Sequence, residues 1–310
     1  MLAASFFFAV MAACTKAGAM EFGTYELVFY RQLFAAVVLF GWAMATHRSI
    51  KTRYIGGNLK RSILGNIALL IWFWAIARLP LGTAMTLNYT NPLFMAAIVT
   101  VIAALRHERI EWKLLGCVAL GFLGITLVLK PDVHNSDFLV GMIGLTSGFF
   151  AALAQFQIRQ MAVLKEPTWR IVFYFSLVGA IAGLGGHCLL EGPLTPITLD
   201  NAPAVLGMSV CGVLAQLCLT QAWGGSSLLL TSSLQYSAIV FAAIIGLVFF
   251  HEALGWAAIL GIAVIILAGL LATLETKRNA TTSKAAVAHK PAREPGDEHP
   301  EAQNPTRKTR

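Results

Sequence analysis

Two short patterns of ionisable residues in this sequence could in principle bind a metal ion. Each reads His-Glu-x-x-x-Trp, and the copies stand 144 residues apart. The residues are His107, Glu108 and Trp112 in the first copy and His251, Glu252 and Trp256 in the second. A zinc-binding HExxH helix, which would place two imidazoles on one helical face, does not occur. The same offset maps Phe29-Tyr30 onto Phe173-Tyr174, so the pattern indicates an internal repeat.

The elements that carry these residues are long apolar runs. The chain is 57% hydrophobic and only 12% charged, whereas soluble domains carry about 25% charged residues. A run of about 20 apolar residues spans the hydrocarbon core as a helix, because lipid leaves no other partner for the backbone. The expected spans are 2–20, 26–46, 62–79, 81–105, 112–130, 138–158, 169–190, 203–223, 226–250 and 256–274.

The repeat divides these spans into two halves of five. We expect an all-α integral membrane protein with repeats at 1–130 and 131–274 around a central cavity, followed by a disordered tail at 275–310. Because five is odd, the halves must cross the membrane in opposite senses, as in secondary transporters with inverted repeats. The two His-Glu pairs then lie on opposite faces and cannot share a metal. Glu108 and Glu252 are expected to complement the positive ends of the helices that follow them.

Basic residues give the orientation. Five Lys and Arg lie in 47–61, three between 106 and 113, three between 159 and 170, and eight after 275. Only Arg78 and Lys130 lie at the opposite ends of the spans. The excess of positive charge marks the cytoplasmic side. We therefore expect a protein of the bacterial inner membrane with both termini in the cytoplasm. The net charge of +8 therefore reflects orientation, and no nucleic-acid partner is expected.

The cysteines and the first residues complete this description. The five cysteines lie in apolar runs without a CxxC spacing, which favours thiols over disulfides or metal sites. The first apolar run begins at Leu2 without a basic leader, and we interpret it as a retained span. Whether the true start lies upstream of Met1 stays open.

Lys16 and Arg31 are the only basic residues well inside the apolar runs. Charged groups in a membrane usually face a partner or a cavity. One hypothesis is that both reach the outer rim and pair with Glu21 and Glu26. The other is a positive outer vestibule that attracts a carboxylate or phosphate, in which the fork of Arg31 recognises the anion.

Polar residues interrupt two spans at corresponding places. Asn88-Tyr89-Thr90-Asn91-Pro92 breaks the fourth span, and Ser232-Ser233-Leu234-Gln235-Tyr236 breaks the ninth. Paired interruptions mark the binding site of many carriers, although interhelical hydrogen bonding also draws amides into bundles. The predicted substrate-binding residues are Lys16, Arg31, Trp72, Asn88, Tyr89, Asn91, Trp223, Ser233, Gln235 and Tyr236.

These residues resemble the drug/metabolite transporter superfamily, specifically its ten-helix EamA-type members. The likeness covers about residues 2–274 and includes Lys16, the Phe29-Tyr30-Arg31 start of the second span, Leu79-Pro80-Leu81-Gly82, and Glu108 and Glu252. Tyr236 stands where the family has a second proline. The resemblance implies a helical basket with a central cavity, and helices five and ten outside it.

The leading hypothesis is a secondary transporter for a small metabolite, an amino acid or a related compound, that works by alternating access. A lipid-modifying membrane enzyme and a channel or receptor are the alternatives. No acidic residue lies deep in a span and no Walker motif occurs, so we expect a facilitator or exchanger without a cofactor.

Overall fold

The computed structural model describes residues 1–105, 112–129, 136–225, 231, 234–252 and 255–288, and these residues form helices without a strand. The helices of the first half are α1 (Leu2–Gly18), α2 (Thr24–Ala45), α3 (Ile55–Ile76), α4 (Leu81–Asn88), α5 (Asn91–Leu105) and α6 (Trp112–Leu129). Those of the second half are α7 (Ser136–Val163), α8 (Thr168–Leu190), α9 (Ala202–Gly225), α11 (Ser237–Phe250) and α12 (Trp256–Ala288).

Hydropathy and length agree with a membrane-spanning bundle. Within the described residues, six helices are long and apolar enough to cross a bilayer, at 24–45, 55–76, 138–163, 168–190, 202–225 and 256–275. Three shorter apolar helices accompany them, at 2–18, 116–127 and 237–250. The chain is therefore a multi-pass membrane protein.

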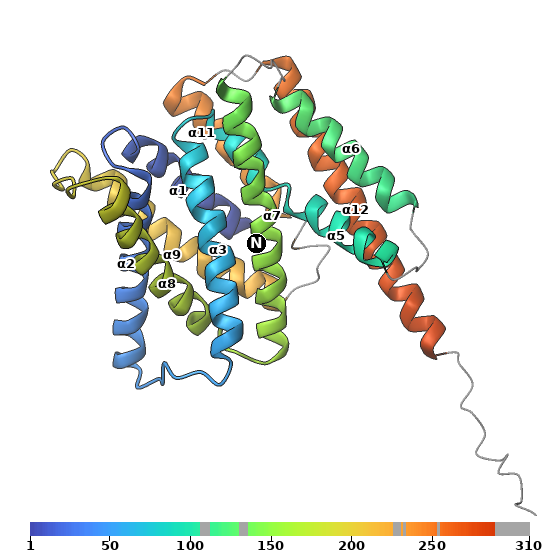
Figure 1. The fold of residues 1–310 in the computed structure, drawn as a ribbon, viewed down its shortest axis with the longest axis horizontal. Helices are drawn as coiled ribbons and strands as arrows, with labels where there is room; N and C mark the ends of the chain where they lie inside the picture. The colour runs from blue at the N-terminus through green and yellow to red at the C-terminus, as the bar shows by residue number, and fades with distance from the viewer. Residues whose placement is uncertain (106–111, 130–135, 226–230, 232–233, 253–254, 289–310) are drawn as a thin grey trace, which may run out of the picture.

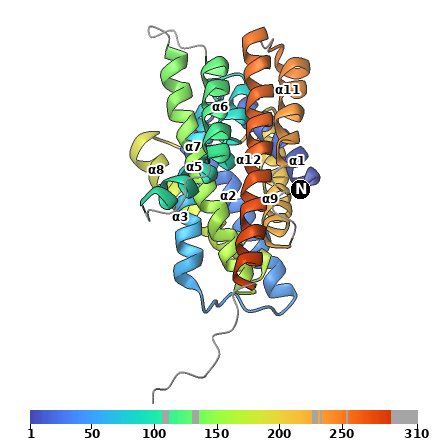
Figure 2. The same ribbon diagram turned by 90° about the vertical axis from the view of Figure 1, so that its right-hand side faces the viewer.

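Helix packing joins the two halves throughout. Helix α1 packs against α9, α3 against α7, and α2 against α8. Helices α6 and α12 pack against each other and lean away from the remaining bundle (Figures 1 and 2). The α2–α3 and α7–α8 connections and the far end of α12 lie at one end of the molecule, which is the lower end in Figure 1.

The opposite end is held by acidic side chains that cap helices from a distance. Glu191 accepts the backbone N–H groups of Tyr25 and Glu26, at 2.9 and 3.0 Å, in the first turn of α2. Glu252 accepts the N–H of Leu81, at 2.7 Å, at the start of α4. Carboxylates at helix N-termini satisfy free N–H groups and oppose the helix dipole. The expectation that Glu252 complements the helix that follows it is wrong, because its carboxylate caps α4 instead.

A left-handed residue explains why Glu252 turns back. His251 ends α11 with φ of 54°, and the N–H of Glu252 then donates to Gly246 O at 3.0 Å. This bond closes the end of the helix. It directs the Glu252 carboxylate over Gly246, toward α4 and away from α12.

The expected fourth span is broken where the sequence predicted an interruption. Helix α4 ends at Asn88 and α5 begins at Asn91, so only Tyr89 and Thr90 separate them. Proline at position 92 has no N–H and cannot continue the ladder from α4. The prediction of a polar break in this span is confirmed. In the ninth span, residues 226–230, 232 and 233 lie outside the described part, and α11 follows directly after Tyr236.

Two helix bounds differ most from the expected ones. Helix α12 continues to Ala288, so 275–288 is helical where a disordered tail was expected. Extending a helix costs far less than starting one, and this stretch has four alanines and lacks Gly and Pro. Helix α3 begins at Ile55 rather than 62, which moves Lys60 and Arg61 from the predicted loop into the helix.

Glycine lets α7 approach the break in the fourth span. A Cβ on Gly148 would meet Thr90 Oγ1, and would lie 2.7 Å from Leu87 O. We expect Gly148→Ala to destabilise the protein by about 1–3 kcal/mol, because two of the three nearest atoms, Leu87 O and Asn88 O, belong to the backbone and cannot move aside easily. Gly41→Ala is the control, since Gly41 is helical and has open space around it. Melting of the two purified variants in detergent would test this, and equal melting temperatures would contradict it.

Candidate central cavity

The two predicted interruptions meet in the centre of the bundle. The amide of Gln235 donates from Nε2 to Asn91 Oδ1 at 2.9 Å, and these residues are 144 positions apart. Each therefore occupies the equivalent place in its own half. Asn91 is 2% exposed and Gln235 is fully buried. The structure thus brings together two of the residues that the sequence selected.

Hydroxyl and amide side chains satisfy the backbone at both breaks. Thr90 Oγ1 donates to Leu87 O at 2.6 Å, and Ser5 Oγ donates to Leu234 O at 3.2 Å. Asn88 Nδ2 donates to Ser147 Oγ at 3.1 Å. A free carbonyl inside a membrane needs such partners unless it lines a cavity. These bonds hold the breaks in place and leave other polar groups free to face the cavity.

A cavity of about 70 Å³ lies beside this bond. Polar and aromatic residues on its wall include Arg61, Trp72, Asn88, Tyr89, Asn91, Gln155, Phe175 and Gln216. Pockets for small molecules commonly measure about 300–1,000 Å³, so the cavity in this conformation admits a small group but not a whole metabolite.

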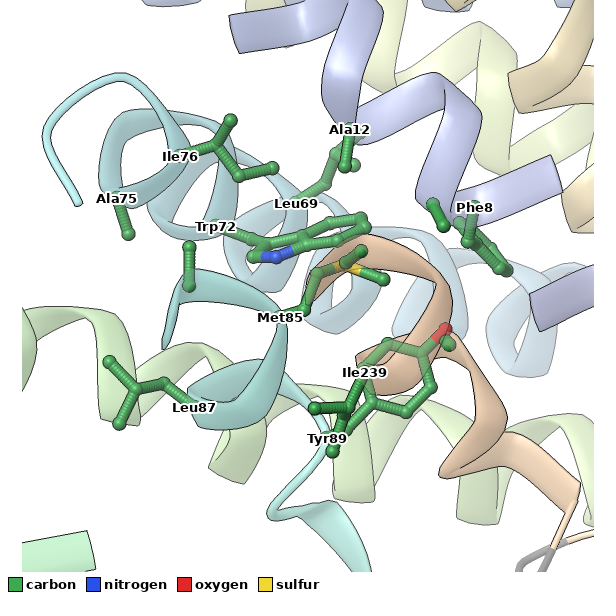
Figure 3. Packing of buried hydrophobic residues seen from close by; sticks show 14 of the residues in the cluster. Phe8, Ala12, Leu69, Trp72, Ala75, Ile76, Met85, Leu87, Tyr89 and Ile239 are labelled. Atoms are coloured by element: carbon green, nitrogen blue, oxygen red, sulfur yellow. The ribbon is translucent and has the colours of Figure 1, made fainter. Parts of the chain in front are cut away.

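The wall toward the α4 start is closely packed. Trp72 lies between Leu69 and Met85, and Phe8 and Tyr89 lie beside it (Figure 3). The rings of Phe8 and Trp72 meet edge to face with centroids 6.0 Å apart. Trp72 is 4% exposed, and its Nε1 has no hydrogen-bond partner among the described residues. The indole ring is therefore closely packed, and its one polar atom makes no hydrogen bond to the described residues.

Arg61 is the residue that sequence reasoning missed. It is 3% exposed, and its guanidinium carbon lies 4.4 Å from the centre of the Phe175 ring. Its Nε and Nη1 have no hydrogen-bond partner within the described residues. Gly65 makes room for it, since a Cβ there would meet Nη1. The predicted span began at residue 62, so Arg61 was assigned to the loop before it. Its position one helical turn before Gly65 is the sequence pattern that could have indicated a buried arginine.

Arg31 lies deeper than either sequence hypothesis assumed. It is 1% exposed, and its Nη1 donates to Gln32 Oε1 at 2.8 Å. Its guanidinium carbon is 5.9 Å from the centre of the same Phe175 ring. It is not in an outer vestibule, and no ion pair to Glu21 or Glu26 forms in the structure. A Cβ on Gly212 would lie 2.7 Å from its Nε, so that glycine leaves space for the buried side chain.

Lys16 lies outside the cavity wall and has other partners than expected. Its ammonium forms an ion pair with Glu252 and donates to Leu79 O at 2.6 Å. The hypothesis of pairing with Glu21 or Glu26 is therefore wrong for Lys16. The pair links α1 to the end of α11 and to the start of α4, so it ties the two halves together at one end.

The remaining predicted site residues fall in different places. Tyr236 is buried, and its hydroxyl lies where a Cβ of Gly269 on α12 would be. Trp223 is half-buried against the main core. Neither contributes to the cavity wall. Ser233 lies outside the described residues. The structure thus gathers Trp72, Asn88, Tyr89 and Asn91 at the cavity, with Gln235 bonded behind Asn91.

Apolar helices surround a cavity that is lined by both apolar and polar residues, in a multi-pass membrane protein. Residues 1–130 and 139–274 each match the EamA-like transporter family. The chain belongs to that family, and it is a transporter of small metabolites and not an enzyme.

Several curated proteins are similar to this chain. The pseudopaline exporter CntI of Pseudomonas aeruginosa is 29% identical over 275 residues, which cover 89% of this chain and 94% of the exporter. An S-adenosylmethionine uptake transporter of Rickettsia prowazekii is 25% identical over 263 residues, or 84% of this chain and 86% of that protein. A solved crystal structure also shares the fold, with a TM-score of 0.61 and 17% sequence identity. The alignment covers 89% of this chain and 98% of the chain in that structure.

Proposed function

We propose that this protein is a carrier that moves a small polar metabolite, an amino acid or a related compound, across the bacterial inner membrane by alternating access. The observation that carries the proposal is the bond between Asn91 and Gln235, because it joins equivalent points of the two halves at the helix breaks. Such breaks supply the substrate sites of carriers built from repeats. The named cargoes of the relatives, pseudopaline and S-adenosylmethionine, differ and include export and uptake. They leave the cargo and the direction of this chain to experiment.

We propose further that the chain crosses the membrane ten times as two inverted repeats. In this plan α4 and α5 together form the fourth crossing, and residues 226–250 the ninth. The contacts support a two-fold relation: the packing of α1 on α9 has its counterpart in that of α3 on α7. The pairs α2–α8 and α6–α12 each join equivalent elements.

Both termini are proposed to lie in the cytoplasm, because basic residues gather at that end of the spans. A reporter fused after residue 275 is expected to be active only in its cytoplasmic form. Activity of a reporter that works only outside the cytoplasm would contradict this orientation.

In this orientation the conformation is closed toward the outside. The packed Trp72 wall and the link between Lys16 and Glu252 lie between the cavity and that face. Wall residues such as Arg61 and Ile158 come from the cytoplasmic halves of α3 and α7. Passage of a metabolite then requires the halves to separate on one side while they close on the other.

The transported compound can be identified by comparing metabolites in a deletion strain and an overproducing strain. Proteoliposomes preloaded with that compound are expected to take up the labelled form faster than empty ones, because a carrier exchanges cargo. A channel would show no such acceleration. Since the acidic residues lie toward span ends, we expect no uphill accumulation from a pH gradient alone. Accumulation of that kind would contradict a facilitator or exchanger.

A further inference from the structure

Two buried cations meet one aromatic ring in the centre of the bundle. The guanidinium carbons of Arg61 and Arg31 lie 4.4 and 5.9 Å from the centre of the Phe175 ring. Within the described residues neither arginine forms an ion pair. A buried charge is costly without a counter-charge, and two like charges near each other add repulsion. The ring offsets only part of this cost.

Four acidic side chains at the helix ends have other partners. Glu252 pairs with Lys16, Glu166 with Arg170, and Glu191 with His187. Glu26 accepts the backbone and hydroxyl of Thr195, at 2.7 and 2.9 Å. These contacts lie at the ends of the helices. The protein groups described around the cavity therefore leave its positive charge uncompensated.

Among the cavity-lining residues that the structure describes, the fully buried side-chain atoms without a hydrogen-bond partner are all nitrogen donors. Arg61 presents Nε and Nη1, and Trp72 presents Nε1, all without partners among the described residues. These three groups can only donate. Gln216 Nε2 is also unpaired there, and its amide can turn to offer either atom. A ligand that fits such a wall must supply acceptors, and an anionic oxygen is the strongest acceptor for a guanidinium.

We propose that the cavity binds the acid group of the transported metabolite, a carboxylate or a phosphate, between Arg61, Trp72 Nε1 and Gln216. This inference rests on the proposed carrier function and names the chemical class of its cargo. Arg61 forms the ion pair, Trp72 and Gln216 donate to the remaining oxygens, and Phe175 holds the guanidinium in place. Arg31, held by Gln32, adds positive potential from behind the ring. An acid group also suits the small volume of about 70 Å³.

Thermal unfolding of the full-length protein in detergent tests this binding without transport. The probes are citrate, succinate and inorganic phosphate, with sucrose and putrescine as neutral and cationic controls at matched ionic strength. A ligand that binds the folded state raises the melting temperature with concentration. Citrate or succinate is expected to do so if the cargo is a carboxylate, and phosphate if it is a phosphate; sucrose and putrescine are expected not to.

Variants then locate the effect. Arg61→Gln is expected to lower the affinity for the stabilising anion at least about tenfold, because a charged hydrogen-bonding partner is lost. Arg61→Lys keeps the charge without the fork and should recover part of the affinity. Trp72→Phe removes the Nε1 donor and keeps an aromatic ring. It tests the same site if Arg61→Gln does not fold. Arg78→Gln is the matched control. The guanidinium carbon of Arg78 also lies over an aromatic ring, 4.3 Å from the centre of the Trp74 ring, but Arg78 is exposed.

Stabilisation by anions that is equal in the wild type, Arg61→Gln and Trp72→Phe would overturn the proposal. So would the absence of stabilisation by every anion at tens of millimolar. The proposed function fails separately: anion binding without transport in proteoliposomes would leave the acid site standing and remove the carrier. Transport of an uncharged compound that Arg61→Gln does not slow would keep the carrier and remove the acid site.

Discussion

Asn91→Leu and Gln235→Leu are each expected to reduce transport at least about tenfold and to lower the melting temperature. Each change leaves the other amide buried without its partner, which costs about 1–3 kcal/mol. The bond between them, at 2.9 Å, joins the two halves beside the cavity. Transport is measured as counterflow of the identified metabolite in proteoliposomes.

The double variant Asn91→Leu/Gln235→Leu separates a role in binding from a role in folding. Removing both amides leaves no unpaired group, so the melting temperature should recover toward that of the wild type. Transport should not recover, because Asn91 lines the cavity and would no longer offer an amide to the cargo. If transport recovers together with stability, the pair only holds helices together, and the polar breaks are not a substrate site.

The second large effect is expected at the Lys16–Glu252 link. This ion pair joins α1 to the end of α11, and Glu252 also caps α4. If the outer side opens by separation of these elements, a covalent bridge there must stop transport. We expect Lys16→Cys/Glu252→Cys, made in a chain without the five native cysteines, to transport no measurable cargo after treatment with a short bis-maleimide.

Two controls accompany the bridge. Each single-cysteine variant treated with the same reagent should keep the rate that it has before treatment, because it cannot form a bridge. If the bridged protein transports at the rate of the untreated double variant, α1 and the end of α11 do not separate during transport, and the expectation is wrong. Either result is independent of the identity of the cargo.

The sequence predicted the centre of this molecule better than its ends. Amides and a proline in an otherwise apolar run are conspicuous because lipid gives them no partner, and this marked Asn88 to Pro92 as a break. The spacing of the repeat then paired Asn91 with Gln235. Both inferences rest on local chemistry and on symmetry, which the linear sequence records directly.

The partners of charged residues depended on tertiary structure and were not predictable in this way. Glu21 and Glu26 are near Lys16 in sequence, but the left-handed turn at His251 brings Glu252 to it instead. Arg31 appeared shallow because its depth was counted along one helix; Met11, Gln32 and Phe175 enclose it from around the bundle. Such distances between helices leave no trace in a hydropathy window.

Arg61 shows a second limit of hydropathy. A charged residue at the edge of an apolar run lowers the window average, so the run is read as starting after it. Helix α3 nevertheless extends to Ile55, and Gly65 opens the space in which the guanidinium lies. A small residue four positions beyond an arginine places both on one helix face, and this is the pattern that would have selected Arg61.

The most direct measurement of the central claim is the accessibility of the cavity from each side of the membrane. Ala154 lines the cavity, and Ala154→Cys is placed in the cysteine-free chain, once alone and once together with Lys16→Cys/Glu252→Cys. A membrane-impermeant maleimide is expected to label it from the outside in spheroplasts and from the cytoplasmic side in inverted vesicles. In the second chain the Lys16→Cys/Glu252→Cys pair is first closed as a disulfide by a mild oxidant, which leaves the thiol at position 154 free to react. Labelling from the outside should then stop, and labelling from the cytoplasmic side should remain. Labelling from both sides in the bridged protein, or from neither side in the free one, would contradict alternating access through this cavity.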